Sequence, residues 1–98
     1  MQVSFSQTAK EQLREIKLFI AKDNPARAIK YIKKLIDRIR KFLEFPYIGK
    51  VNATYNREDI REIVIEGYKI IYHIVSGKII ILVIYKNINL NESDINIY

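Results

Sequence analysis

The stretch that decides the fold runs from Ile60 to Tyr85 and reads IREIVIEGYKIIYHIVSGKIIILVIY. Its three segments are rich in β-branched and aromatic residues, which favour strands. Short glycine-containing turns at Glu66-Gly67 and Ser76-Gly77-Lys78 separate them, so the stretch predicts an antiparallel meander. The last segment, residues 79–85, is apolar throughout, which predicts a central strand covered on both faces.

Two amphipathic helices are predicted upstream of the meander. A short strand around Val3 and Phe5 comes first, and Ser6 or Thr8 can then cap a helix that ends near Lys22. Apolar residues recur in this segment at helical spacing. The sequence thus predicts a strand and then a helix with one apolar side.

The second predicted helix begins at Asn24-Pro25 and runs to about Glu44. Asn is a favoured N-cap, and Pro suits the first helical position because its missing N–H would be unpaired there. The short connection makes the two helices an antiparallel hairpin. The predicted fold class is α+β: an N-terminal strand and a helical hairpin packed on a small antiparallel sheet.

The whole chain of 98 residues is predicted to be one domain. Its core spans about residues 3–86. Residues 87–98 form an Asn-rich tail that fits a fraying end, a small added strand, or a segment ordered by a partner.

Positive charge is concentrated in the helical half. The formal net charge is +6, and twelve of the seventeen Lys and Arg residues lie within residues 1–50. One face of the second helix carries a row of cations opposite its apolar stripe: Arg27, Lys30, Lys34, Arg38 and Lys41. Such a row is typical of a solvated helix face, and it also suits an acidic partner or nucleic acid.

Composition excludes several classes of function. The chain has no cysteine and one histidine, so neither a disulfide framework nor a zinc or iron–sulfur site is expected. No phosphate loop or dinucleotide fingerprint is present, and we expect no cofactor. The longest apolar run is too short to cross a bilayer, and no secretory signal is evident. We therefore expect a soluble cytoplasmic protein without a membrane partner.

Two polar side chains on the middle segment of the meander fall on one face. Lys69 and His73 lie four positions apart, and side chains alternate sides along a strand. An imidazole base near a lysine could support metal-free RNA cleavage. The alternative is a strand with an ordinary solvated face. Tyr68 and Tyr72 point to the other side, where packing is the expected role.

Several short motifs follow one another along residues 3–86. They are Ser6 and Ala9; Asn24-Pro25 with Ala28; Leu43 followed by Pro46 and Gly49; Arg61-Glu62-Ile63; Gly67-Tyr68-Lys69-Ile70-Ile71-Tyr72; and Ile81-Leu82-Val83-Ile84. In this order and spacing, the chain resembles the RelE/ParE superfamily of toxins from type II toxin–antitoxin modules, and the ParE branch most. The family fold of two helices on an antiparallel sheet agrees with the fold predicted above.

The resemblance implies a growth-inhibiting toxin neutralised by a cognate antitoxin, with operator DNA bound only through the toxin–antitoxin complex. Antitoxins of this kind are often acidic and disordered when free. The residues expected to bind the partner are Arg27, Lys30, Lys34, Arg38, Lys41, Arg61 and Tyr68.

The family divides by target. RelE-like members cut mRNA in the ribosome, and ParE-like members poison DNA gyrase. Lys69 stands at a position where RelE has an arginine, Asn89 falls where a later arginine would stand, and Glu62 lies at or beside a RelE lysine. Since the nuclease set is incomplete, the resemblance favours gyrase.

Two alternatives stay open. A ribosome-dependent endoribonuclease would use the residues Lys69, Arg61, His73, Tyr85 and Lys86. An inactive member of the family would act only as a binding module.

Overall fold

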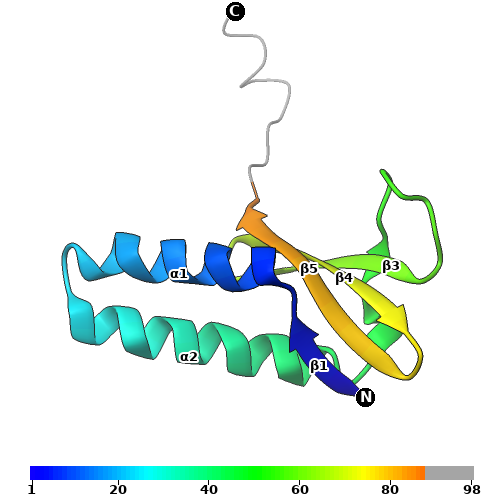
Figure 1. Cartoon of the computed structure of the whole chain (residues 1–98), viewed down its shortest axis with the longest axis horizontal. Helices are drawn as coiled ribbons and strands as arrows, with labels where there is room; N and C mark the ends of the chain where they lie inside the picture. Colours follow the sequence, from blue (N-terminus) through cyan, green and yellow to red (C-terminus); the bar gives the residue numbers. More distant parts are fainter. Residues whose placement is uncertain (88–98) are drawn as a thin grey trace, which may run out of the picture.

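A computed structural model describes residues 1–87 of the chain. The elements follow the order β1 (Gln2–Phe5), α1 (Gln7–Ala21), α2 (Pro25–Phe42), the short 3₁₀ helix η1 (Pro46–Ile48), β2 (Lys50–Val51), β3 (Ile60–Ile65), β4 (Tyr68–Val75) and β5 (Lys78–Lys86). Figure 1 shows the two helices side by side, extending beyond one end of the sheet. The expected tail lies, apart from Asn87, outside the described residues.

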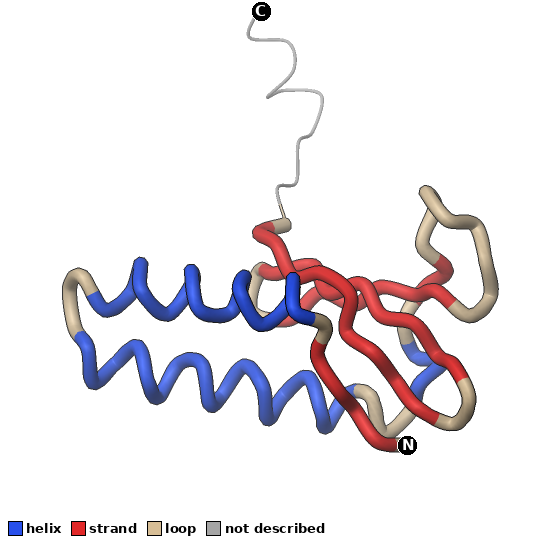
Figure 2. Tube along the Cα trace, viewed as in Figure 1, coloured by secondary structure: helices blue, strands red, loops and turns tan. Residues whose placement is uncertain are grey.

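The five strands form one sheet in the order β1-β5-β4-β3-β2. Pairs β2–β3, β3–β4 and β4–β5 are antiparallel, as the meander predicts. The β1 strand is the exception, because it runs parallel to β5 at the other edge of the sheet. Figure 2 shows the connection, which leaves β1, passes through both helices and returns to the sheet. The predicted α+β arrangement is confirmed.

Two-residue turns set the register of the meander. Glu66 and Gly67 both have positive φ angles, and so do Ser76 and Gly77. Two successive positive φ angles are typical of the type I′ turn, whose twist matches that of antiparallel strands. The sequence pattern placed Lys78 in the second turn, but in the structure it is the first residue of β5.

The helix starts follow the capping rules. Ser6, rather than Thr8, caps α1 and accepts a hydrogen bond from the Ala9 amide at 3.0 Å. Its hydroxyl also donates to the Leu82 carbonyl at 2.7 Å. Leu82 lies where the β4–β5 register shifts by one residue, so the Ser6 hydroxyl binds the carbonyl of an irregular position. The α2 helix begins with Asn24 accepting from the Arg27 amide at 3.0 Å.

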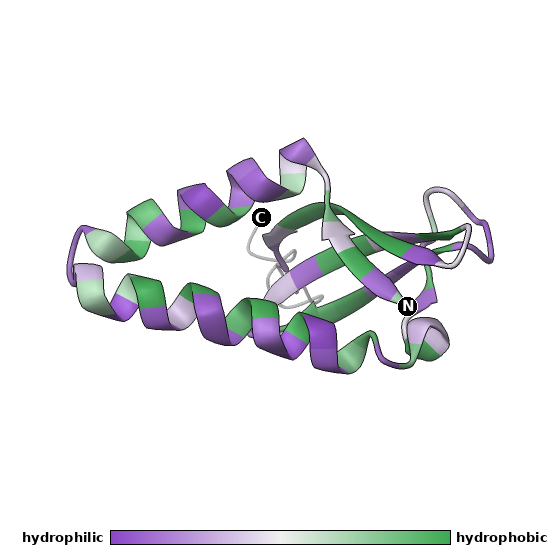
Figure 3. Cartoon of the chain, turned by 60° about the horizontal axis from the view of Figure 1, so that its bottom comes forward, coloured by the Kyte–Doolittle hydropathy of each residue, from purple (hydrophilic) through white to green (hydrophobic). Residues whose placement is uncertain are grey.

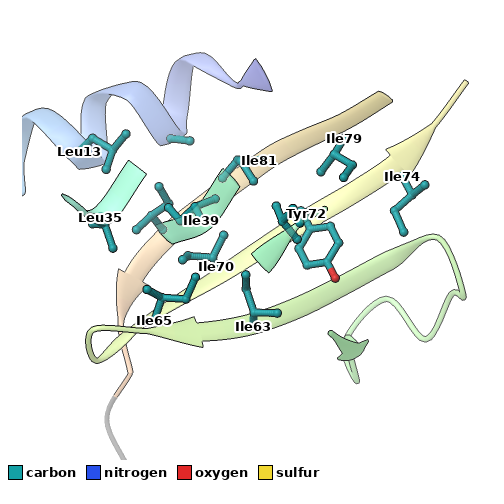
Figure 4. Close-up of a cluster of buried hydrophobic side chains, with 13 residues drawn as sticks. Leu13, Leu35, Ile39, Ile63, Ile65, Ile70, Tyr72, Ile74, Ile79 and Ile81 are labelled. Carbon is teal, nitrogen blue, oxygen red and sulfur yellow. The ribbon is translucent and has the colours of Figure 1, made fainter. Parts of the chain in front are cut away.

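A continuous apolar core lies between the helical hairpin and one face of the sheet. Figure 4 shows Leu13 of α1 and Leu35 and Ile39 of α2 above the strands. The sheet contributes a row of isoleucines and the fully buried Tyr72: Ile63, Ile65, Ile70, Ile74, Ile79, Ile81 and Ile84. Figure 3 shows mainly hydrophobic strands and helices with alternating hydrophobic and hydrophilic bands. Packing of the helices against this face is the main stabilising contribution to the fold.

The helices cover one face of the sheet only. The sequence predicted that β5 is central and covered on both faces, and this is wrong in part. The central strand is β4, and β5 lies one place nearer the edge. On the side away from the helices, Ile80, Leu82 and Val83 are half-buried. Among residues 1–87, no helix covers these apolar side chains. An apolar run in the sequence cannot show whether both faces of its strand are covered.

The predicted packing role of Tyr72 is confirmed. Its hydroxyl donates to the Pro46 carbonyl at 2.6 Å and accepts from the Gly49 amide at 3.1 Å. A methyl group on Gly49 would lie 2.5 Å from that hydroxyl and 2.6 Å from the Glu62 carbonyl. Glycine is therefore needed here for space, and this close approach fixes the loop after α2 against the sheet.

Candidate functional site: the open face of the sheet and the outer face of α2

The open face is the side of the sheet turned away from the helices. Strand alternation and the pairing register place on it Lys50, Glu62, Val64, Lys69, Ile71, His73, Val83 and Tyr85. Lys69 and His73 share this face, as the alternation predicted.

Glu62 is the most buried charged residue of the open face, with 5% of its surface exposed. Its Oε2 lies 3.2 Å from Lys69 Nζ and 4.0 Å from Lys50 Nζ. Both contacts are ion pairs, and neither has the geometry of a hydrogen bond. Its Oε1 accepts a hydrogen bond from Asn52 Nδ2 at 3.0 Å. The Glu62 carboxylate raises the pKa of Lys69, so this lysine stays charged. The Glu62 carboxylate therefore forms ion pairs with both Lys69 and Lys50.

Asn52 connects Glu62 to the loop between β2 and β3. Its side-chain oxygen accepts from the amides of Thr54 and Tyr55, each at 3.1 Å. Its carbonyl accepts from the Asn56 amide at 2.8 Å, and Asn56 has a positive φ angle that asparagine tolerates well. The buried Asn52–Glu62 pair thus orders the start of the loop.

His73 is tied to the far end of the same loop. Its Nε2 lies 2.9 Å from Asp59 Oδ2, and Asp59 also accepts two hydrogen bonds from Arg57, at 2.9 and 2.6 Å. The hydrogen bond from His73, and then that from Arg57, lower the pKa of Asp59. The backbone adds a contact, because the Ile74 amide donates to the Asp59 carbonyl at 2.8 Å.

The predicted nuclease residues are only partly brought together. Lys69 Nζ lies 6.0 Å from the centre of the Tyr85 ring, so these two are neighbours. His73 is four residues along β4, roughly 13 Å away at the usual rise of a strand, and it contacts a different carboxylate. Lys86 is exposed and paired with Tyr68, on the opposite side of the sheet from Tyr85.

Arg61 points away from the open face and is bound to backbone. Its Nη1 donates to the carbonyls of Gly49 at 2.9 Å and Tyr47 at 3.3 Å, and its Nε donates to the Glu58 carbonyl at 2.9 Å. Its guanidinium also lies 4.9 Å from the centre of the Tyr47 ring and pairs with the Glu58 carboxylate. Since most of its donors are used within the fold, these contacts favour a structural role.

The outer face of α2 is formed by the predicted cations, all of which are exposed: Arg27, Lys30, Lys34, Arg38 and Lys41. A shallow groove along the helix is lined by four of them together with Lys33 and Asp37. Lys33 was missed, although it lies three residues after Lys30 and so on the same side of the helix. Glu66, in the β3–β4 turn, pairs with Arg38 and lies 3.7 Å from Lys34 Nζ.

The tip of the helical hairpin forms a second hollow. Arg27 and Tyr68, both predicted to bind the partner, line it together with Tyr31 and Phe19. Phe19 is 71% exposed, so the hollow has an apolar rim. Burial, followed by the charges of Tyr68 and Glu66, raises the pKa of Tyr31. The structure thus brings two predicted residues, which are far apart in sequence, into one place.

Among residues 1–87, no group of three or more His, Cys, Asp and Glu residues is arranged to hold a metal ion. No helix in the same part of the chain is long and apolar enough to cross a membrane.

Solved structures share this fold. The chromosomal ParDE toxin–antitoxin system from P. aeruginosa contains a chain that superposes with a TM-score of 0.72 at 15% identity, covering 90% of this chain and 97% of that one. The isolated E. coli RelE toxin gives a TM-score of 0.63 at 16% identity, with 94% and 88% covered. The toxin fold in the intact E. coli RelBE complex gives 0.60 at 16% identity, with 90% and 98% covered. At such identities the likeness shows the fold.

A family model defines the relationship more narrowly. The model described as the ParE toxin of the type II toxin–antitoxin system, parDE, matches residues 3–86. The chain therefore belongs to the ParE toxin family, as the order of its motifs predicted. A search of curated proteins finds no match.

Proposed function

We propose that this ParE-family toxin inhibits growth by poisoning DNA gyrase and is neutralised by a cognate acidic antitoxin. The observation that carries the proposal is the match to the ParE model across residues 3–86. The open face supports it, because Lys69 and His73 are each bound to a carboxylate and Arg61 faces elsewhere. Among residues 1–87, His73 also lies roughly 13 Å from Lys69 along β4, so this base and this cation are not adjacent as RNA cleavage would require.

The test measures both targets with the same purified protein. Gyrase and supercoiled plasmid are incubated with the toxin, and trapped cleavage complexes are counted after detergent and protease treatment. In parallel, a translated message is mapped by toeprinting. We expect accumulated gyrase–DNA cleavage and an intact message. Cuts at codon positions in ribosome-bound mRNA, with gyrase unaffected, would reverse the assignment.

The endoribonuclease remains the second candidate, because Lys69 and Tyr85 are neighbours on the open face. It predicts that Lys69→Ala abolishes mRNA cleavage. The matched control is Lys78→Ala, which removes an exposed lysine from the start of β5. If expression without antitoxin leaves growth, gyrase and messages unaffected, the chain is instead a binding module.

The outer face of α2 is the proposed docking surface for the antitoxin. Its cations are exposed, and only Lys34 and Arg38 have a carboxylate within ion-pair distance among residues 1–87. An acidic segment would be attracted to such a surface. Solved structures with the same fold come from the ParDE system of P. aeruginosa and from the RelBE toxin–antitoxin complex of E. coli, which supports an antitoxin partner here.

The docking proposal is tested with the cognate antitoxin, which we expect to be a short acidic protein encoded next to this chain. The variant Lys30→Gln/Lys34→Gln/Lys41→Gln should bind it roughly 10- to 100-fold more weakly at low salt. The control Lys10→Gln/Arg14→Gln/Lys22→Gln makes the same charge change with exposed residues of the first helix and its end. Equal losses in the two variants would show that net charge, and not the α2 surface, determines the affinity.

A further inference from the structure

Glu62 is placed where a phosphate of a bound nucleic acid would otherwise find two lysines. A hollow on the open face is lined by Lys50, Glu62, Val64 and Lys69 among others. Both ammonium groups lie within 4.0 Å of one Glu62 oxygen. Val64, beside them, is 50% exposed, so the hollow is reached from solvent. Without the carboxylate, the two cations would face solvent there.

The carboxylate is held firmly in this position. It is 5% exposed, and Asn52 donates to its other oxygen at 3.0 Å. Glu62 is also a mid-strand residue directly opposite Lys50 on β2 and Ile71 on β4. Because the side chain cannot move aside without breaking the Asn52 hydrogen bond, it remains between the lysines when a ligand approaches.

Electrostatics determine what this face can hold. A phosphate that approaches Lys69 meets the Glu62 carboxylate at almost the same distance, and the attraction and the repulsion largely cancel. Nucleic-acid affinity grows with the number of phosphates that cations neutralise. Because Glu62 offsets one of the two positive charges, Lys69 and Lys50 together release fewer counterions, and add less affinity, than two unpaired lysines would.

We propose that Glu62 is an internal counterion that prevents the open face from binding single-stranded RNA. Glu62 acts through Lys69 and Lys50, so it is a positioning residue that determines specificity. The inference rests on the proposed function and deepens it, since it gives a physical reason why this toxin, unlike RelE-like members with the same fold, would not act on RNA.

The test is the affinity of Glu62→Gln for a fluorescein-labelled oligouridine, measured by fluorescence anisotropy across a salt series. Glutamine has the same shape and can still accept the Asn52 hydrogen bond. We expect binding to become about tenfold tighter at low salt, and the salt slope to become steeper by roughly 0.7, because the change removes one negative charge. A purely structural role for Glu62 would not steepen this slope.

Two variants separate the local effect from net charge. Glu15→Gln removes one negative charge from an exposed position of α1, and its affinity should stay within about twofold of the wild type at moderate salt, where distant charges are screened. Glu62→Gln/Lys69→Gln should lose most of the gained affinity. If Glu62→Gln binds oligouridine no better than Glu15→Gln, the inference is wrong.

A measurement on the unaltered protein covers the case in which Glu62→Gln does not fold. Oligouridine added at low salt should shift NMR amide signals along α2 and leave those around Lys69 in place. Shifts centred on Lys69 and Lys50 would overturn the inference. Since these experiments contain no gyrase, a negative result here leaves the gyrase assay standing, and a failed gyrase assay leaves the RNA result standing.

Discussion

The two sides of the sheet carry different kinds of side chain. On the covered side, isoleucines and Tyr72 pack against both helices, and Tyr72 makes the main buried polar contacts through its hydroxyl. On the open side, Glu62 and Asp59 bind Lys69, Lys50 and His73. The covered side holds the fold together. The open side carries the charged contacts on which the proposed discrimination against RNA rests.

The largest expected effect concerns packing on the covered side. Ile81→Ala removes a fully buried side chain of β5 and should lower the free energy of unfolding by about 3 kcal/mol. Val64→Ala, on the open side and 50% exposed, should change it by roughly 0.5 kcal/mol or less. Urea denaturation of both variants measures the difference. Equal losses would show that the open side is packed as tightly as the covered side.

A second prediction concerns the buried hydroxyl of the covered side. Tyr72→Phe leaves the Gly49 amide and the Pro46 carbonyl without their partner. We expect a loss of about 2 kcal/mol in unfolding free energy, the usual cost of unsatisfied buried groups. Tyr55→Phe is the control, because Tyr55 is 54% exposed. A Tyr72→Phe variant as stable as the wild type would mean that water or a backbone shift replaces the hydroxyl.

The third prediction tests the ion pairs of the open side through pH. The pKa of Asp59 is lower in the folded protein than its ordinary value of 3.8, so its stabilising effect is present above that value and is lost as pH falls through the lowered pKa. Asp59→Asn should therefore flatten the acid side of the stability profile and lower stability near neutral pH. Thermal melts of both proteins from neutral to acidic pH measure this. Parallel profiles would show that the His73 and Arg57 contacts contribute nothing.

The smallest effect on stability is expected at Glu66, in the β3–β4 turn. Glu66→Gln removes a carboxylate that pairs with Arg38 and Lys34, whose side chains are 46% and 64% exposed. Such exposed pairs contribute about 0.5 kcal/mol or less. The same change frees two cations on the outer face of α2, so the affinity for the proposed acidic antitoxin should rise. Unchanged affinity by calorimetry would place that partner elsewhere.

Local sequence patterns were enough for β1, both α-helices and the three strands of the meander, but not for η1 or the short strand β2. Ser6 and Asn24 mark the helix starts, and the Glu66-Gly67 and Ser76-Gly77 pairs mark the turns of the meander, because caps and tight turns need particular residues within a few positions. The helical period likewise placed Lys30 and Lys34 on the exposed side of α2. Such features involve neighbours in sequence, which is why they can be predicted from it.

The site depended on pairings that no local pattern contains. Sequence alternation placed Lys69 and His73 on one face, but only the strand register set Glu62 beside Lys69 and Lys50. A shift of one residue would turn Glu62 towards the core and bring Arg61 to the open face, which would become more positive. The contacts of Arg61 with the loop after α2 have the same origin.

The sequence by itself determined the order of the two α-helices and of β1, β3, β4 and β5, the family and the concentration of positive charge on α2. The tertiary structure alone decided that β1 lies parallel to β5, that one side of the sheet stays open, and that Glu62 lies beside Lys69 and Lys50 and Asp59 beside His73. The reason is distance along the chain. Periodicity reports which side of an element a residue occupies, whereas the partner of a charge depends on how separate elements align.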